Sequence, residues 1–350
     1  MSAKPGPLSS AGSPRVIDLA IEEVPDALME RLRAMPVGWF SSADFCTMFH
    51  ASPARRARIV VDDAGNPVEA VYYRTEGRLF ARVHVFGPPS LTGRQVSDLL
   101  KDLGARAAHV WLMPAPVLPD TPGAWWQPRG RTMPMTVVDL PRTAGEYLAR
   151  LGPRTRKHLP YYERRLRREW PDAEMAFHEN GQITPQMVEE LVALNRARIE
   201  SRGGVHGGFE GDVLMRRARL AARSGLMLAV RRAGRLVGGT LCYIHRQEAF
   251  LALIGHDPQY DRLNLGNVCL WLTVQRLIDR GIGRFNLLWG ASFYKQQFGG
   301  VAAPAYEIRV CRGPLSACFM RVLTAGDALR LWARRAINFL RRAMRGATRR

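Results

Sequence analysis

The hydrophobic and polar positions of the chain repeat one order of elements twice. In each copy, three apolar strands with tight turns between them precede a crossover helix and a fourth strand. The first copy predicts strands at residues 58–61, 67–73, 79–86 and 109–113 and a helix at 92–103. The second copy predicts strands at residues 226–231, 236–245, 249–255 and 284–289 and a helix at 264–280. The pattern therefore indicates two copies of one α+β lobe.

A helical section separates the two copies. Thr143 and Glu146 have the spacing of a capping box, and Thr184-Pro185 marks the start of a later helix. In that later helix, positions 188, 191, 192, 195 and 199 follow helical spacing, and all of them are apolar except Asn195. A further helix is expected over residues 211–223, after the glycine-rich loop 202–208.

The two ends of the chain differ from the lobes in composition. Residues 1–14 are rich in Ser, Gly and Pro without an apolar core, so we expect a disordered lead-in and not a signal peptide. Residues 324–350 contain eight arginines around an apolar stripe, which is typical of a basic amphipathic helix on an anionic membrane surface. A helix docked on its own domain is the alternative. Between these ends we expect a first lobe at residues 15–139 and a second at 140–323.

The charge of the chain points to an anionic partner. Its 350 residues include 51 Lys and Arg against 31 Asp and Glu, a net charge of +20, and only four of the basic residues are Lys. Nucleic acid, a phosphorylated cofactor and an acidic membrane all fit this charge, as does a general Arg-rich composition. The five scattered cysteines suggest neither a disulfide framework nor a metal site. We therefore expect a cytoplasmic protein, with a peripheral position on the inner membrane surface as an option through 324–350.

The segment 254–300 carries the most informative chemistry. No GxGxxG, GxxxxGK[ST], HExxH or GxSxG motif occurs, which argues against the dinucleotide, P-loop, zincin and α/β-hydrolase classes. A helix start at Asn264, Leu265, Gly266 and Asn267 follows directly after a predicted strand and a short loop. Such a helix start exposes backbone N–H groups suited to a pyrophosphate, with Arg262 adding charge. An ordinary strand-to-helix loop is the alternative.

Several motifs in this order resemble a known family. They are the basic helix 154–168, the hairpin at Gly234, His256-Asp257-Pro258, and Phe293-Tyr294-Lys295 followed by Phe298-Gly299. The segment 140–311 resembles GNAT acyltransferases, and more closely the acetyltransferase domain of the cellulose-biosynthesis (CelD/BcsL) type, which is related to the Fem aminoacyl transferases with two GNAT lobes. The resemblance implies mixed, mostly antiparallel sheets with flanking helices, and coenzyme A bound at the helix start.

The loop at this helix start departs from the family pattern. GNAT loops read Gln/Arg-x-x-Gly-x-Gly/Ala, whereas Arg262 is followed by a single glycine, Gly266. Fem relatives use aminoacyl-tRNA with a similarly altered loop, so both donors stay open. The first lobe has Gly87-Pro88-Pro89 at the equivalent place, and proline offers no N–H to a phosphate. We therefore expect the first lobe to be structural or to bind the acceptor.

The requirements of acyl transfer suggest roles for individual residues. A base must take the proton of the nucleophile, and an acid must protonate the leaving group. His256 and Asp257 are candidate bases, although Asp257 before Pro258 also suits a turn. Lys295 is expected to meet a negative charge on the donor or acceptor, as the resemblance implies, and Tyr294 to protonate the leaving thiolate. The expected substrate-binding residues are Arg154, Lys157, Arg202 and His206.

We therefore predict an acyltransferase that moves an acyl group, acetyl from acetyl-CoA in the leading hypothesis, to an amine or hydroxyl of a saccharide or envelope precursor. The acceptor would lie between the lobes. The alternatives are a Fem-like transferase that uses aminoacyl-tRNA, and a catalytically inactive GNAT scaffold with a membrane-associating tail. No metal is expected.

Overall fold

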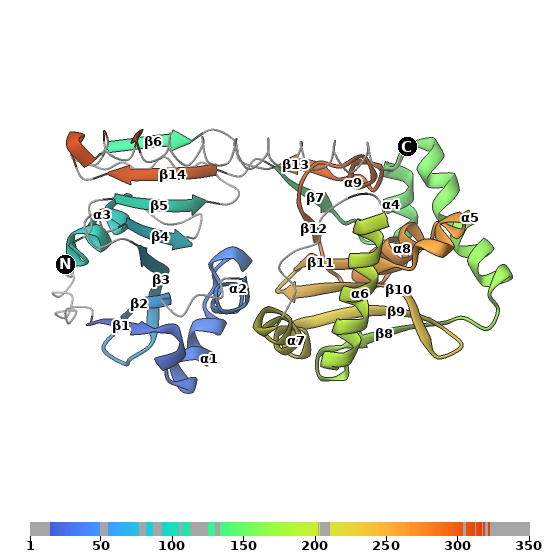
Figure 1. Ribbon diagram of the computed structural model, residues 1–350, viewed down its shortest axis with the longest axis horizontal. Coiled ribbons are helices and arrows are strands. Elements are labelled where there is room, and N and C mark those ends of the chain that lie inside the picture. The colour runs from blue at the N-terminus through green and yellow to red at the C-terminus, as the bar shows by residue number, and fades with distance from the viewer. Residues whose placement is uncertain are drawn as a thin grey trace, which may run out of the picture.

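The computed structural model consists of two mixed sheets with helices on their faces, arranged side by side (Figure 1). It describes residues 15–49, 55–76, 82–86, 93–104, 107–112, 125–129, 134–201, 203, 211–303, 306–311, 313–316, 318 and 321–322. The predicted lead-in at residues 1–14 and the predicted tail at 324–350 lie outside these described residues. The α+β fold class expected from the sequence is confirmed.

The first sheet has seven strands in the order β1-β2-β3-β4-β5-β14-β6. All neighbouring strands are antiparallel except β4 and β5, which are parallel. The strands are β1 (Arg15–Ala20), β2 (Arg55–Val61), β3 (Pro67–Glu76), β4 (Arg82–Phe86), β5 (Ala107–Leu112), β6 (Trp125–Arg129) and β14 (Tyr306–Cys311). The helices of this lobe are α1 (Asp26–Ala34), α2 (Ala43–Phe49) and α3 (Gly93–Asp102).

The second sheet has the order β13-β7-β12-β11-β10-β9-β8. Its strands are β7 (Met135–Asp139), β8 (Glu174–Glu179), β9 (Gly225–Arg232), β10 (Arg235–His245), β11 (Glu248–His256), β12 (Arg284–Trp289) and β13 (Val301–Ala303). The helices around it are α4 (Ala144–Arg150), α5 (Pro153–Glu169), α6 (Pro185–Ser201), α7 (Asp212–Ser224), α8 (Leu265–Asp279) and α9 (Phe293–Gln297). In both lobes the predicted order of three strands, a helix and a fourth strand is confirmed.

The two threonines predicted to start helices form hydrogen bonds to the first helical turns, as expected. The side chain of Thr143 accepts a hydrogen bond from the backbone N–H of Glu146 (3.2 Å), which caps α4. The hydroxyl of Thr184 accepts from the backbone N–H of Met187 (3.3 Å) ahead of α6. These bonds satisfy N–H groups that have no partner inside the helix, so each helix begins close to the predicted position.

Two strands depart from the predicted lobe boundary at residue 139. β7 precedes that boundary but pairs with β12 and β13 in the second sheet. β14 lies within the predicted second lobe, residues 140–323, but pairs with β5 and β6 in the first sheet. Neither assignment follows from a local pattern, because strand pairing joins residues that are far apart in sequence. The chain therefore passes from the first lobe to the second between β6 and β7 and returns to the first lobe with β14.

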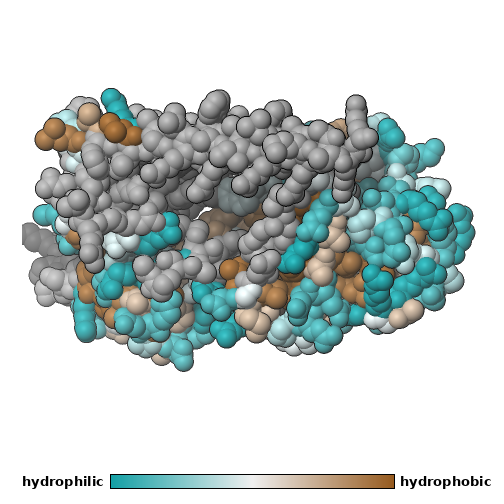
Figure 2. Space-filling view, in the orientation of Figure 1, coloured by the Kyte–Doolittle hydropathy of each residue, from teal (hydrophilic) through white to brown (hydrophobic). Residues whose placement is uncertain are grey.

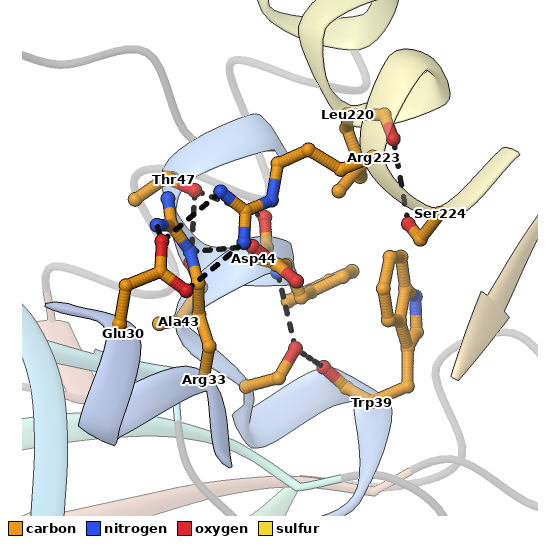
Figure 3. Close-up of polar contacts among 11 residues, drawn as sticks. Glu30, Arg33, Trp39, Ala43, Asp44, Thr47, Leu220, Arg223 and Ser224 are labelled. Atoms are coloured by element: carbon orange, nitrogen blue, oxygen red, sulfur yellow. Dashed lines mark hydrogen bonds and ion pairs between the residues drawn. The ribbon is translucent and has the colours of Figure 1, made fainter. Parts of the chain in front are cut away.

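The lobes meet through an aromatic cluster. Trp39, in a 3-10 helix (η2, Trp39–Ser41), stacks on Tyr243 and Phe250 of the second sheet, with ring centroids 5.7 and 5.1 Å apart. Nearby, Arg223 of α7 forms an ion pair with Glu30 of α1 at 3.3 Å (Figure 3). Trp39 is 2% exposed, so this interface is packed like a core and fixes one lobe against the other.

The second sheet opens between its two parallel strands. β11 and β12 pair only at their first three positions, from Glu248 to Phe250 of β11. A bulge in the pairing with β10 follows directly, between Leu251 and Leu253. In the first sheet, by contrast, β4 pairs with β5 along all five of its residues. The second lobe alone therefore offers, among the described residues, a parallel strand pair that splays apart.

Candidate active site

The splayed end of β11 leads into the start of α8. β11 ends at His256, and a short 3-10 helix (η4, Pro258–Leu263) connects it to α8. Asn264 has φ 54° and ψ 36°, a left-handed conformation that turns the chain sharply into the helix. Leu263 and Leu265 are fully buried on either side of this turn, which anchors the helix start. The first N–H groups of α8 are thereby held at the open edge of the sheet.

A cavity of about 370 Å³ lies at this helix start. It is bounded by the end of β11, by η4 and α8, by one residue of α6 and by two residues of α9. Its lining consists of Arg198, Ile254, His256, Asp261, Asn264, Leu265, Gly266, Asn267, Leu270, Tyr294 and Gln297. The structure thus brings together His256, Tyr294 and the four predicted residues of the helix start.

The polar centre of the cavity is a histidine and carboxylate pair. His256 is 5% exposed, and its Nε2 lies 2.7 Å from Oδ1 of Asp261. The other side of the ring faces Gly266, where an added Cβ would come within 2.9 Å of Nδ1. Gly266 therefore allows α8 to approach the ring, and Asp261 orients it. A histidine held by a carboxylate in this way is suited to accept a proton.

Asp257 does not line the cavity. Its carboxylate accepts hydrogen bonds from the backbone N–H of Gln259 (3.2 Å) and the guanidinium of Arg235 (3.0 Å). This arrangement caps η4, which is the turn role that the sequence offered as the alternative to a base. The carboxylate partner of His256 is Asp261 instead.

Lys295 is buried beneath the end of β12. Its Nζ donates hydrogen bonds to the carbonyl oxygens of Leu288 (3.3 Å) and Trp289 (2.5 Å), and the residue is 5% exposed. Leu288 has a positive φ of 58°, so Lys295 holds a turn that few non-glycine residues adopt. Burial lowers the pKa of Lys295 to about 8. Lys295 therefore supports the wall of the site and does not line the cavity itself.

The remaining predicted residues lie on the surface or outside the described chain. Arg262 has a largely exposed side chain 4.0 Å from Glu169, near the helix start but not in the cavity. Arg154 and Lys157 lie on the exposed face of α5, away from the cavity lining. Arg202 and His206 lie outside the described residues. The structure thus supports no shared site for these residues.

Asp261 and Arg198 are cavity residues that the sequence analysis did not identify. Asp261 reaches His256 only because η4 folds back, which no spacing rule predicts. Arg198 lies on α6, three positions after Asn195. Asn195 is the polar exception in the apolar stripe of that helix. One polar residue within an apolar stripe was therefore the signal that this face of α6 borders the site.

A comparison with known protein families found a match for the segment that surrounds this cavity. Residues 153–296 match a family model described as an acetyltransferase (GNAT) domain. This segment is therefore similar to a GNAT acetyltransferase domain. The match runs from the start of α5 into α9 and includes every residue of the cavity lining except Gln297, which supports an acyltransferase. This favours an enzyme over the inactive scaffold. No protein of curated function matches the sequence.

Several solved structures share the fold over most of the chain. FemX has a TM-score of 0.57 at 8% identity and covers 84% of this chain and 96% of its own. The L-PGS structure from Bacillus licheniformis has a TM-score of 0.54 at 13% identity, with coverages of 86% and 96%. The C-terminal domain of a putative lysylphosphatidylglycerol synthetase from Agrobacterium fabrum has a TM-score of 0.52 at 18% identity, with coverages of 85% and 96%. At these identities the likeness concerns the fold alone. The cellulose-biosynthesis type is not among these findings.

Proposed function

We propose that the GNAT lobe transfers an acetyl group from acetyl-CoA to an amine or hydroxyl of a saccharide or envelope precursor. The observation that carries this proposal is the His256–Asp261 pair in a cavity at the start of α8. The pair supplies a base, and the helix start supplies N–H groups for the donor's pyrophosphate. A candidate base next to a helix start supports a coenzyme A-dependent acyl transfer at this cavity.

The proposed reaction uses the residues that line the cavity. The acceptor's amine or hydroxyl attacks the thioester carbonyl while His256 takes its proton, and Asp261 stabilises the resulting imidazolium. A bond from the acceptor to the acyl carbon forms as the bond from carbon to sulfur breaks. Tyr294, which lines the same cavity, gives a proton to the leaving thiolate. Lys295 keeps the end of β12 in place without touching either substrate.

The donor is proposed to enter along α8. Arg262 is exposed next to the helix start, where its charge suits the phosphates of coenzyme A. The acceptor is proposed to lie between the lobes, with Arg202 and His206 as candidate contacts, whereas Arg154 and Lys157 lie on the exposed face of α5, outside the cavity lining. The first lobe is proposed to serve the acceptor, because its parallel strands β4 and β5 remain paired.

Membrane association is proposed through residues 324–350, which would bring the enzyme to an anionic surface. No helix in the described part of the chain is both long enough and apolar enough to cross a bilayer. The sequence pattern of the tail supports the peripheral position, and the scattered cysteines support a cytoplasmic location.

A second candidate function is Fem-like transfer from aminoacyl-tRNA. The observation that favours it is one face of α5, where Arg154, Lys157, Arg164 and Arg168 follow one another at intervals of three, seven and four residues and all are exposed. Hydrophilic residues dominate this end of the second lobe (Figure 2). A line of cations on one helix face suits a run of phosphates.

Calorimetry with acetyl-CoA and with charged tRNA separates the two functions. We expect acetyl-CoA to bind and the affinity to be insensitive to the substitution of Arg164 and Arg168 by Gln. Binding of charged tRNA alone would replace the leading proposal with the second one. Once an acceptor is found, His256→Gln should lower turnover by about 100-fold or more, the usual contribution of a general base. His178→Gln in β8 is the matched control, because His178 lies outside the cavity lining.

A further inference from the structure

The edge of β11 that faces β12 needs support because the two strands separate after Phe250, while β11 stays paired with β10 on its other edge. Beyond Phe250, no residue of β11 pairs with β12. A carbonyl group in this stretch must find another donor, since a buried backbone group without a partner is unfavourable. The stretch matters for the proposed function, because it contains Ile254 and His256 of the cavity lining.

The hydrogen-bond donor for this edge comes from α6. Nδ2 of Asn195 in α6 donates a hydrogen bond of 2.6 Å to the carbonyl oxygen of Ile254. Asn195 is 6% exposed and is surrounded on its helix face by Val188, Leu191 and Val192. The amide is thus a polar group among apolar side chains of α6, and it reaches the edge of β11 from which β12 has separated.

The backbone geometry around this bond is equally close. A Cβ added at Gly255 would lie 2.8 Å from the backbone N of Asn195 and 2.9 Å from the carbonyl oxygen of Leu191. Only glycine allows α6 to lie this near to β11. Gly255 therefore permits the close approach of α6 to β11, and this proximity lets the amide of Asn195 reach the carbonyl oxygen of Ile254.

We propose that Asn195 is a positioning residue that holds the open end of β11, and with it His256, in the geometry needed for acyl transfer. Ile254 and His256 are two residues apart, so they project on the same side of the strand. Fixing the carbonyl of Ile254 therefore fixes the direction from which His256 meets the cavity. This inference rests on the proposed acyl transfer at this cavity.

Asn195→Asp tests the hydrogen bond through its protonation. A buried carboxylate cannot donate to the carbonyl of Ile254, whereas the protonated acid can. We expect the affinity of Asn195→Asp for acetyl-CoA, relative to wild type, to recover as the pH is lowered from about 8 to about 5.5. Asn195→Leu, which cannot donate at any pH, should remain weak throughout.

Asn286→Asp is the matched control. Asn286 of β12 is also 6% exposed, but its Oδ1 accepts a hydrogen bond from the backbone N–H of Leu288 (2.8 Å), a role that a carboxylate keeps. Asn286→Asp therefore introduces a buried acid without removing a hydrogen-bond donor. Equal recovery at low pH in Asn286→Asp and Asn195→Asp would overturn the proposal.

Hydrogen exchange provides a readout that does not need a bound acyl donor. In Asn195→Leu, the peptide covering residues 251–256 should exchange about tenfold faster or more, the change expected for one lost buried hydrogen bond, while β9 keeps its protection. Unchanged exchange in this peptide would overturn the proposal. If wild type fails to bind acetyl-CoA but the exchange still rises locally, the proposed function falls and the role of Asn195 in holding the strand stands.

Discussion

Lys295 gives the sharpest quantitative prediction, because it is a buried cation without a carboxylate partner among the described contacts of its Nζ. Burial lowers its pKa from 10.5 to about 8. Between these two pH values the unfolded chain keeps the proton and the folded chain has released it. Since the unfolded state then binds more protons, stability rises with pH across this window. A shift of this size corresponds to about 3 kcal/mol at about 1.4 kcal/mol per pKa unit.

The perturbation is Lys295→Met, which keeps an unbranched side chain and removes the titrating group. Urea unfolding of wild type and variant from about pH 7 to about pH 10.5 gives two stability curves. Their difference should grow in favour of wild type by about 3 kcal/mol over this range, while contributions from the other titrating groups cancel. Lys157→Met on the exposed face of α5 is the control and should leave the slope of the curve unchanged.

A difference curve that stays flat with pH would refute the argument that Lys295 is held as a desolvated cation. A pH-dependent stability difference of the same size between wild type and Lys157→Met would also refute this argument. Activity needs no part in this measurement, so the result bears on the support of β12 whatever the substrate is.

Three further predictions address the site, the interface and the tail. Gly266→Ala places a Cβ 2.9 Å from the ring of His256, so turnover should fall while the unfolding midpoint changes little; a normal turnover number would contradict the close approach. Trp39→Ala removes a fully packed ring between the lobes and should cost about 3–5 kcal/mol in urea unfolding, whereas a loss below 1 kcal/mol would show that the interface is loose. Deletion of residues 324–350 should abolish sedimentation with anionic vesicles, and unchanged binding would remove the tail as the anchor.

Much of the fold could be predicted because its signals are local. Tight turns, capping residues and the alternation of apolar positions lie within a few residues of the elements that they define, as at Thr143 and Thr184. The same holds for the start of α8 at Asn264. These positions depend on backbone sterics and hydrogen bonds that a short segment settles by itself.

The parts that the sequence did not predict depend on distant residues. The splay of β11 from β12 depends on strand pairing, and the contact of Asp261 with His256 depends on the fold of η4. The burial of Lys295 likewise follows from the packing of α9 against the end of β12. A candidate list from motifs therefore included Lys295 and Asp257, but could not tell a supporting residue from one that meets the substrate.

The return of β14 to the first sheet has a consequence for how the protein is made. β14 lies between β5 and β6, so these two strands have no neighbour on that side until residues 306–311 have left the ribosome. The first lobe therefore cannot complete its sheet while the second is being synthesised, and its open strand edges must be kept from pairing with other chains. A fragment that stops before β14 should aggregate, and the two lobes should mature as one cooperative unit.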